Sequence, residues 1–272
     1  MEKKKEVYGS VPSQKKHRIS NKITNFFISI YGIFQFIKRF FKEAWRPPYE
    51  VSEIIKQCYN VGYRSLALIS LTGFIIGIVF TKQSRPSLAS FGATSWLPSL
   101  IGIAVIRALA PLITALIAAG KIGSNIGAEL GSMKVTEQID AMEVSATNPF
   151  KFLAVSRILA TTLMLPLLSF YTAFIAMIGS FFNVHANEST SFTAFFKDAF
   201  IQISFLDLNA SIIKALVFGF TIGVTGCYKG FNATKGTEGV GRAANEAVVV
   251  SMFLVFIEEM LIVQVVNYLR GM

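Results

Sequence analysis

Five long apolar stretches restrict this chain to a helical membrane protein. A helix needs about 20 predominantly apolar residues to cross the hydrocarbon core of a bilayer, and most of the stretches reach that length. The composition agrees, since 53% of the residues are hydrophobic and only 15% are charged, against about 25% in soluble domains. We therefore predict an all-α integral membrane protein. Its five predicted transmembrane helices cover residues 66–81, 96–119, 152–182, 208–228 and 247–269.

Glycine and proline residues within these stretches predict departures from regular helices. The first stretch is short for a full crossing, and Gly73 and Gly77 allow close packing or a bend, so we expect a partly re-entrant or broken helix. Pro111 and Pro166 lie within the second and third stretches. Each removes a backbone hydrogen bond, so we expect kinks at places where a neighbour or a cavity satisfies the freed carbonyl.

Basic residues are distributed unevenly between the two sides of the predicted spans. Residues 1–64 carry 13 of the 26 Lys and Arg residues, and the segments 121–157 and 229–242 carry seven more. The opposite loops and the C-terminal end carry four. The positive-inside rule therefore predicts a cytoplasmic N-terminus, and five spans place the C-terminus on the other side. This topology and attraction to anionic lipid account for the net charge of +10, so nucleic acid is not an expected partner.

The N-terminal region differs in character from the apolar remainder. Residues 1–18 form a Lys-rich tail that we predict to be disordered. Apolar side chains recur at helical spacing over residues 19–45 with basic side chains between them, which predicts an amphipathic helix in the membrane interface. A sixth span is the alternative for this segment. A second short helix over residues 49–61 is expected to lead into the first span. The predicted divisions are a tail at 1–18, interfacial and elbow helices at 19–62, and a transmembrane domain at 63–272.

Three glycines near the end of the second apolar stretch predict a close helix contact. Gly123, Gly127 and Gly131 recur every four residues. Glycine at this spacing leaves only hydrogen atoms on one helix face, so another helix can pack against it with the two backbones nearly in contact.

A short acidic helix is predicted directly after these glycines. Thr136 is expected to cap it, Glu137 in its first turn suits the helix dipole, and Asn148 and Pro149 are expected to end it. Its carboxylates form a ridge beside an apolar strip, so we expect it to dock into a basic, partly apolar groove on another protein. The predicted coupling residues are Glu137, Gln138, Ile139, Asp140, Met142 and Glu143.

No pattern of catalytic residues is visible. The segment GFNATKG from Gly230 lacks the spacing of a phosphate-binding P-loop, and the sequence contains no HExxH or paired CxxC motif. Cys58 and Cys227 are isolated thiols that predict neither a disulfide nor a metal site. We expect a chain that is not an enzyme and holds no metal or cofactor, so any ATP hydrolysis must come from another chain.

Arg107 is the charge of greatest interest within an apolar stretch, because a charge there is costly and usually faces a cavity or a partner. Two roles are open. Arg107 either holds a lipid phosphate in a cavity between subunits, or pairs with Glu258 or Glu259 and stabilises the bundle. Asp207 and Lys214, seven residues apart, are expected to share a face of the fourth span in a structural role.

Several long motifs in order resemble the MlaE/YrbE family of ABC-transporter permeases. They include GAELGSMKVTEQIDAMEVSATNP from Gly127, SRILATTLMLPLL around Arg157, GCYKG from Gly226 and GTEGVGRAANEAVV from Gly236. The resemblance covers roughly residues 50–270. It implies a permease subunit without its own ATPase activity.

The family resemblance also implies partners and a substrate. We expect a homodimer that, with a cytosolic ABC ATPase, moves phospholipid between the bacterial inner membrane and an MCE-domain partner, with the C-terminus in the periplasm. The segment RALAP departs from the usual RELGP of the family, since Ala108 replaces a glutamate, so Arg107 is expected to depend more on lipid headgroups. The lipid-binding positions that the resemblance implies are Phe80, Leu88, Phe91 and Arg107.

Two other classes of function are kept as alternatives. A secondary carrier driven by an ion gradient predicts inverted repeats and paired acids within the membrane. A scaffold would only anchor partner proteins, so its apolar cavity would be dispensable.

Overall fold

The computed structural model describes residues 31–47, 49–234 and 236–271, and all regular structure in these ranges is helical. The all-α prediction is therefore confirmed for the described chain. The chain divides into two compact units, residues 1–45 and 46–272. In the first unit, residues 31–44 are helical. The predicted tail and the first part of the predicted interfacial helix lie outside the described residues, and the interfacial position of residues 31–44 remains a prediction.

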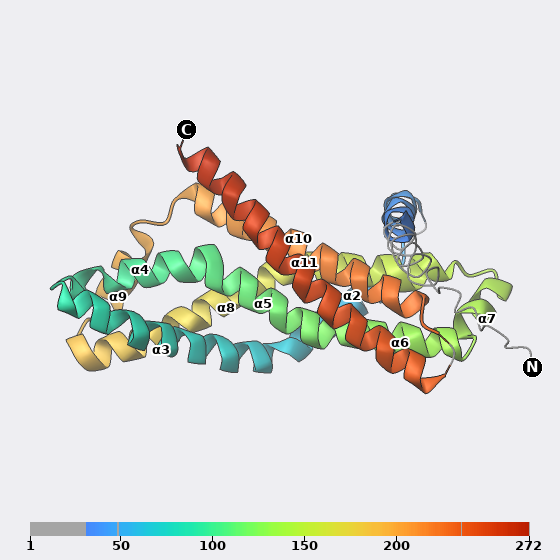
Figure 1. Ribbon diagram of the computed structural model, residues 1–272, viewed down its shortest axis with the longest axis horizontal. Coiled ribbons are helices and arrows are strands. Elements are labelled where there is room, and N and C mark those ends of the chain that lie inside the picture. The colour runs from blue at the N-terminus through green and yellow to red at the C-terminus, as the bar shows by residue number, and fades with distance from the viewer. Residues whose placement is uncertain (1–30, 48, 235, 272) are drawn as a thin grey trace, which may run out of the picture. The chain divides into compact units, whose positions relative to one another are not determined.

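The second unit contains the membrane-spanning helices (Figure 1). Five segments of the described chain are long and apolar enough to cross a membrane, namely Val51–Ser90, Thr94–Val135, Phe150–Glu188, Phe205–Phe231 and Thr237–Gly271. Each contains one predicted span, so all five predicted spans are confirmed within the described residues. In chain order the helices are α2 (Val51–Val61), η1 (Tyr63–Ser65), α3 (Leu66–Ser90), η2 (Thr94–Trp96), α4 (Leu97–Ala104), η3 (Val105–Leu109), α5 (Ala110–Ala118), η4 (Ala119–Gly123), α6 (Ser124–Val135), α7 (Gln138–Val144), η5 (Phe150–Val155), α8 (Ser156–Glu188), α9 (Phe192–Phe200), α10 (Phe205–Phe231) and α11 (Thr237–Gly271).

The first span is longer and more regular than predicted. Helix α3 continues without interruption to Ser90, so the prediction of a re-entrant or broken helix is wrong. Its glycines instead allow close packing against α8. A Cβ atom at Gly77 would lie 1.9 Å from the carbonyl oxygen of Ala176, a distance at which only hydrogen fits.

The second membrane segment is a continuous helical run that widens twice into π-helix, at η3 and η4. Pro111 lies in the first turn of α5, directly after η3, where the π-helical turn already interrupts the regular hydrogen-bond ladder. Pro111 cannot donate to the carbonyl of Arg107, four residues earlier. Lys214 from α10 donates to that carbonyl instead, at 2.9 Å, which is the neighbouring donor that the sequence analysis expected.

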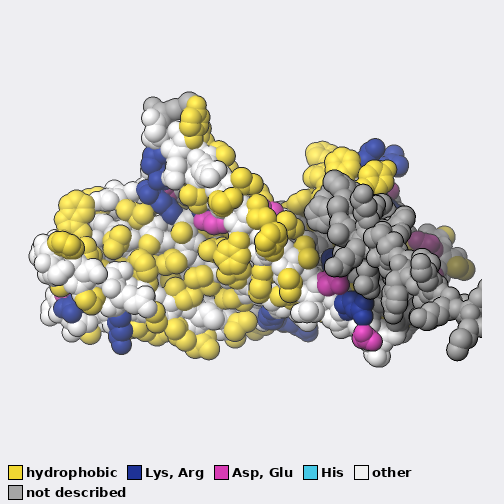
Figure 2. All heavy atoms as spheres, viewed as in Figure 1, with side chains coloured by type: hydrophobic (Ala, Val, Ile, Leu, Met, Phe, Trp, Pro, Cys, Tyr) yellow, Lys and Arg dark blue, Asp and Glu magenta, His cyan; other side chains and the backbone are white. Residues whose placement is uncertain are grey.

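The apolar core lies where α4, α8 and α9 meet, around buried Ile101, Met177 and Phe195. The spans are buried to different extents. In the most apolar window of α10, 67% of the residues are buried, whereas the figure for α11 is 11%. Helix α11 therefore presents most of its apolar surface outward, and hydrophobic side chains cover much of the face seen in Figure 2.

Candidate functional site

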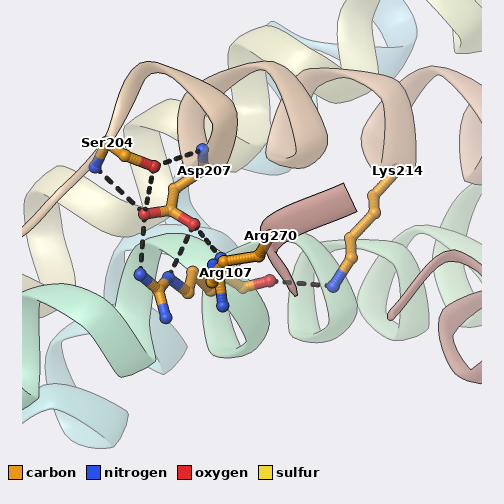
Figure 3. Close-up of polar contacts among 5 residues, drawn as sticks. All are labelled: Arg107, Ser204, Asp207, Lys214 and Arg270. Atoms are coloured by element: carbon orange, nitrogen blue, oxygen red, sulfur yellow. Dashed lines mark hydrogen bonds and ion pairs between the residues drawn. The ribbon is translucent and has the colours of Figure 1, made fainter. Parts of the chain in front are cut away.

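Arg107 forms a two-point ion pair with a carboxylate one hundred residues later in the chain (Figure 3). Its Nε atom lies 2.7 Å from Oδ1 of Asp207, and its Nη2 atom donates to Oδ2 at 2.8 Å. Helix η3 supplies the arginine, and the first turn of α10 supplies the aspartate. Such a paired arrangement fixes the orientation of the guanidinium as well as its charge.

Asp207 is held in place by its own helix terminus and by a second arginine. Ser204 caps α10, and its backbone N–H and hydroxyl donate to Oδ2 of Asp207 at 3.0 and 2.9 Å. Arg270, near the end of α11, donates to Oδ1 (Figure 3). The Asp207 side chain is 0% exposed, whereas those of Arg107 and Arg270 are 31% and 39% exposed. The Asp207 carboxylate is therefore bonded only to groups within the described protein, whereas the guanidinium groups of Arg107 and Arg270 each remain partly accessible.

A third cation completes this group of charges. Lys214 Nζ lies 2.6 Å from Glu259 in α11, in addition to its bond to the Arg107 carbonyl. Glu258 accepts a hydrogen bond from Thr221. The alternative in which Arg107 pairs with Glu258 or Glu259 is therefore wrong, because Arg107 pairs with Asp207 and Lys214 pairs with Glu259. We call Arg107, Asp207, Lys214, Glu259 and Arg270 the charged cluster.

The charged cluster borders a cavity of about 220 Å³. Three cations and one carboxylate line the cavity, so its wall carries an excess of positive charge. The remaining lining is largely apolar and comes from η3, α10 and α11. Its residues are Arg107, Ala108, Asp207, Ala210, Lys214, Val263, Val266, Asn267 and Arg270. Positive charge within an apolar frame suits an anionic group that is attached to a hydrocarbon body.

The other expected lipid-binding residues lie elsewhere in the same chain. Phe80 and Leu88 pack against the core around Ile101 and Met177, and Phe91 is 83% exposed just after α3. None of the three lines the cavity beside Arg107. Within one chain the structure therefore does not bring the four predicted positions together.

The acidic helix is shorter than predicted and begins differently. Thr136 closes the preceding helix α6, and its hydroxyl donates back to the carbonyl of Ser132, so its predicted role as an N-cap is wrong. Glu137 takes that position with a left-handed φ of 59°. The helix ends at Val144, before the predicted Asn148 and Pro149.

The side chains of α7 divide between the protein and the solvent. Ile139 is buried at 3% exposure, whereas Val144 is 90% exposed. Asp140 pairs with Lys134 at 2.8 Å, and both side chains are partly exposed. Among the described residues Glu137 and Glu143 form no ion pair. We call Glu137, Asp140 and Glu143 the acidic face of α7.

The three glycines of the predicted stripe face the last two spans. A Cβ atom at Gly127 would lie 3.1 Å from the Cα atom of Ala244, and one at Gly131 would lie 3.3 Å from Cβ of Ala233. At Gly123 it would reach Ile222 and Ser251 at ordinary contact distance. Helix α6 therefore lies close to the backbone of α11, and a larger side chain at Gly127 would separate the two helices.

Ser204 and Arg270 are the members of the site that the sequence analysis missed. Arg270 was counted only as a charge at the C-terminal end. Ser204 and Asp207 show the spacing of a capping box, a serine followed three residues later by an acid, which would have located the start of α10 and the carboxylate. No comparable local signal links Arg270 to Asp207.

These features define a multi-pass helical membrane protein with a cation-rich cavity between its spans and an acidic helix outside them. Comparison with known proteins gives the family. The family model of permease MlaE matches residues 54–265. A probable ABC transporter permease protein of Rickettsia typhi is 33% identical over 87% of this chain and 91% of its own length. Similar proteins of Synechocystis and Pyropia yezoensis, also named probable ABC transporter permeases, are 36% and 35% identical over 75% and 76% of this chain, and over 77% and 79% of their own lengths.

The chain therefore belongs to the MlaE permease family of ABC transporters. It is a transport subunit and not an enzyme, and an ABC transporter of this kind works with an ATPase. Family membership favours the permease over the ion-coupled carrier and the scaffold.

Proposed function

We propose that the chain is a homodimeric permease that moves phospholipid between the bacterial inner membrane and an MCE-domain partner. The observation that carries the choice of substrate is the cavity beside the charged cluster. Asp207, the one carboxylate among its described lining residues, is buried, whereas Arg107 and Arg270 keep exposed edges. A phosphate can accept hydrogen bonds from these edges without displacing Asp207.

The size of the cavity agrees with a headgroup and not with a whole lipid. A volume of about 220 Å³ lies below the roughly 300–1,000 Å³ of pockets that enclose drug-sized ligands. The acyl chains would therefore lie outside the cavity, on apolar surface. Helix α11 offers such a surface beside the cavity, since Leu261 and Val265 are 51% and 58% exposed.

A second copy of the chain would complete the lipid path. Phe80, Leu88 and Phe91 lie apart from the Arg107 cavity within one chain, so the lipid-binding set can only meet across a dimer or after a movement of α3. The weak burial of α11 and the outward apolar residues of α3 leave enough apolar surface for either lipid or a second copy.

The acidic face of α7 is the proposed docking site for the ATPase. The distribution of Lys and Arg supports a cytoplasmic position for this helix, where ATP is available, with the N-terminus on the same side and the C-terminus in the periplasm. Arg107 and Lys134 both belong to the continuous segment Thr94–Val135. Movement of α7 can therefore reach the charged cluster along one helical run, guided by the close contact of Gly127 with α11.

The proposal is tested by purifying the complex from cells that express the chain with its ATPase and MCE partners. The variant Glu137→Lys/Glu143→Lys reverses two carboxylates that have no partner within the described chain. We expect it to lose the ATPase while it retains bound phospholipid. Glu238→Lys is the control, because Glu238 is 87% exposed and, among the described residues, pairs only with Arg242 in the next helical turn. Retention of the ATPase by the double variant would refute docking at α7.

A further inference from the structure

We infer a second lipid site, in which the phosphate of a membrane phospholipid binds between the elbow helix α2 and the π-helix η4. A cavity of about 410 Å³ lies there, and it shares no lining residue with the cavity beside the charged cluster. Its polar lining residues are Gln57, Asn60, Arg64, Lys121, Asn125 and Glu129. The proposal does not depend on the function of the Arg107 cavity.

Two cations in this second cavity have no carboxylate partner among the described residues. Lys121 Nζ donates to the backbone carbonyl of Arg64, which brings the two side chains to the same wall. In the described part of the chain neither Arg64 nor Lys121 forms an ion pair. Among the described lining residues Glu129 is the only carboxylate, and it pairs at 2.8 Å with Arg157, whose side chain is 3% exposed. The cavity therefore carries net positive charge, which favours an anion.

The amide side chains strengthen the case for a phosphate. Asn60 and Asn125 line the same wall, and their side chains make no hydrogen bond to another described residue. A phosphate presents several acceptor oxygens and can bind a guanidinium, an ammonium and amide N–H groups together. The side chains that line the second cavity therefore offer more hydrogen-bond donors than a carboxylate could accept from, which favours a phosphate as the ligand.

The surface next to the cavity indicates a lipid and not a free anion. From Arg64 onward, apolar side chains continue at helical spacing along α3, and all are exposed: Leu68, Leu71, Ile75 and Val79 are between 42% and 60% accessible. An acyl chain attached to a phosphate at Arg64 can lie along this face.

Two tyrosines mark the level of the membrane interface at the same place. Tyr59 and Tyr63 stack with ring centroids 5.0 Å apart, and they are 53% and 63% exposed. Exposed tyrosines are typical of the headgroup region of a bilayer. Polar headgroup contacts and apolar chain contacts would therefore meet at the boundary between η1 and α3.

The test measures lipid binding to the full-length protein by native mass spectrometry in mild detergent. The probes are dioleoyl phosphatidylglycerol and dioleoylglycerol, which share acyl chains but differ in the phosphate. All proteins carry Arg107→Gln, so that the cavity beside the charged cluster is weakened to the same extent in every protein compared. We expect Arg64→Gln/Lys121→Gln to bind phosphatidylglycerol roughly tenfold more weakly, which corresponds to about 1.4 kcal/mol. The charge-preserving pair Arg64→Lys/Lys121→Arg and the distant variant Arg242→Gln should bind as tightly as the parent.

Three results would overturn the inference. If the double glutamine variant bound phosphatidylglycerol as tightly as the parent protein, Arg64 and Lys121 would have no role in binding. Equal binding of dioleoylglycerol by the parent would show that the phosphate is not recognised. Displacement of phosphatidylglycerol by millimolar inorganic phosphate would show a site for a free anion in which the acyl chains contribute nothing.

Discussion

The charged cluster and the acidic face of α7 both contain carboxylates, but only the cluster pairs all of its acidic groups within the chain. Asp207 accepts from Arg107, Arg270 and Ser204, and Glu259 pairs with Lys214. Glu137 and Glu143 have no such partner among the described residues. The difference indicates two kinds of site. The cluster is built by the chain itself and leaves cations available, whereas we propose that the acidic face of α7 binds cations of another protein.

The largest expected effect comes from removing the carboxylate at the centre of the cluster. Asp207→Ala leaves Arg107 and Arg270 without their anion between the spans, and we expect a loss of about 3 kcal/mol of stability, at the lower end for a broken buried pair because both arginines are partly exposed. Thermal denaturation in one detergent measures the loss. If this variant had the same melting temperature as the wild type, Asp207 would not hold the charged cluster together.

Gly127→Ala tests the connection between the two regions. The added Cβ atom would lie 3.1 Å from the Ala244 backbone and force α6 away from α11, at a cost of about 1–2 kcal/mol. We expect the ATPase to remain bound while its hydrolysis no longer responds to lipid. Gly241→Ala is the control, since nothing lies within 4 Å of its added Cβ. Normal coupling in Gly127→Ala would show that this helix contact does not transmit the movement.

Arg270→Gln removes one of the two arginines from Asp207 and should have a smaller effect. Arg107 still neutralises the carboxylate, and the Arg270 side chain is 39% exposed, so we expect a loss of about 1 kcal/mol. The same denaturation measurement applies. A loss as large as that of Asp207→Ala would mean that Arg270, and not Arg107, is the main partner.

The smallest effect is expected at the acidic face of α7. Lys134→Ala breaks an ion pair whose two side chains are 37% and 54% exposed, and such pairs contribute less than about 1 kcal/mol. The melting temperature should hardly change. A loss comparable to that at Arg270 would show that α7 is held by its charges in the same way as the charged cluster.

The sequence predicted the features that depend on local composition. The number of spans follows from the lengths of apolar stretches, because bilayer thickness sets the length of a crossing helix. The sequence also marked Arg107 as a charge in need of a partner. The prediction of a break in the first span was wrong because the polar residues after Thr81 are still helical, and α3 continues to Ser90.

The partners within the site could not be predicted in the same way. Arg107 and Asp207 meet because η3 and α10 pack in a particular register, and that register depends on contacts such as those of Gly219 and Gly223 with α8. From the sequence, Glu258 and Glu259 were as plausible as Asp207 as partners of Arg107, since all three lie in or at the edge of apolar stretches. At α7, the left-handed residue Glu137 starts the helix one position later than a threonine cap would.

The most direct test of the proposed transport is reconstitution of the permease with an ABC ATPase and the proposed MCE partner in liposomes that contain a fluorescent phospholipid. We expect ATP-dependent transfer of the phospholipid between the liposome membrane and the MCE partner, and loss of transfer in Arg107→Gln, which should still fold because Arg270 keeps Asp207 paired. ATP hydrolysis without movement of phospholipid would contradict phospholipid transport, and unchanged transfer by Arg107→Gln would contradict a role of the Arg107 cavity in it.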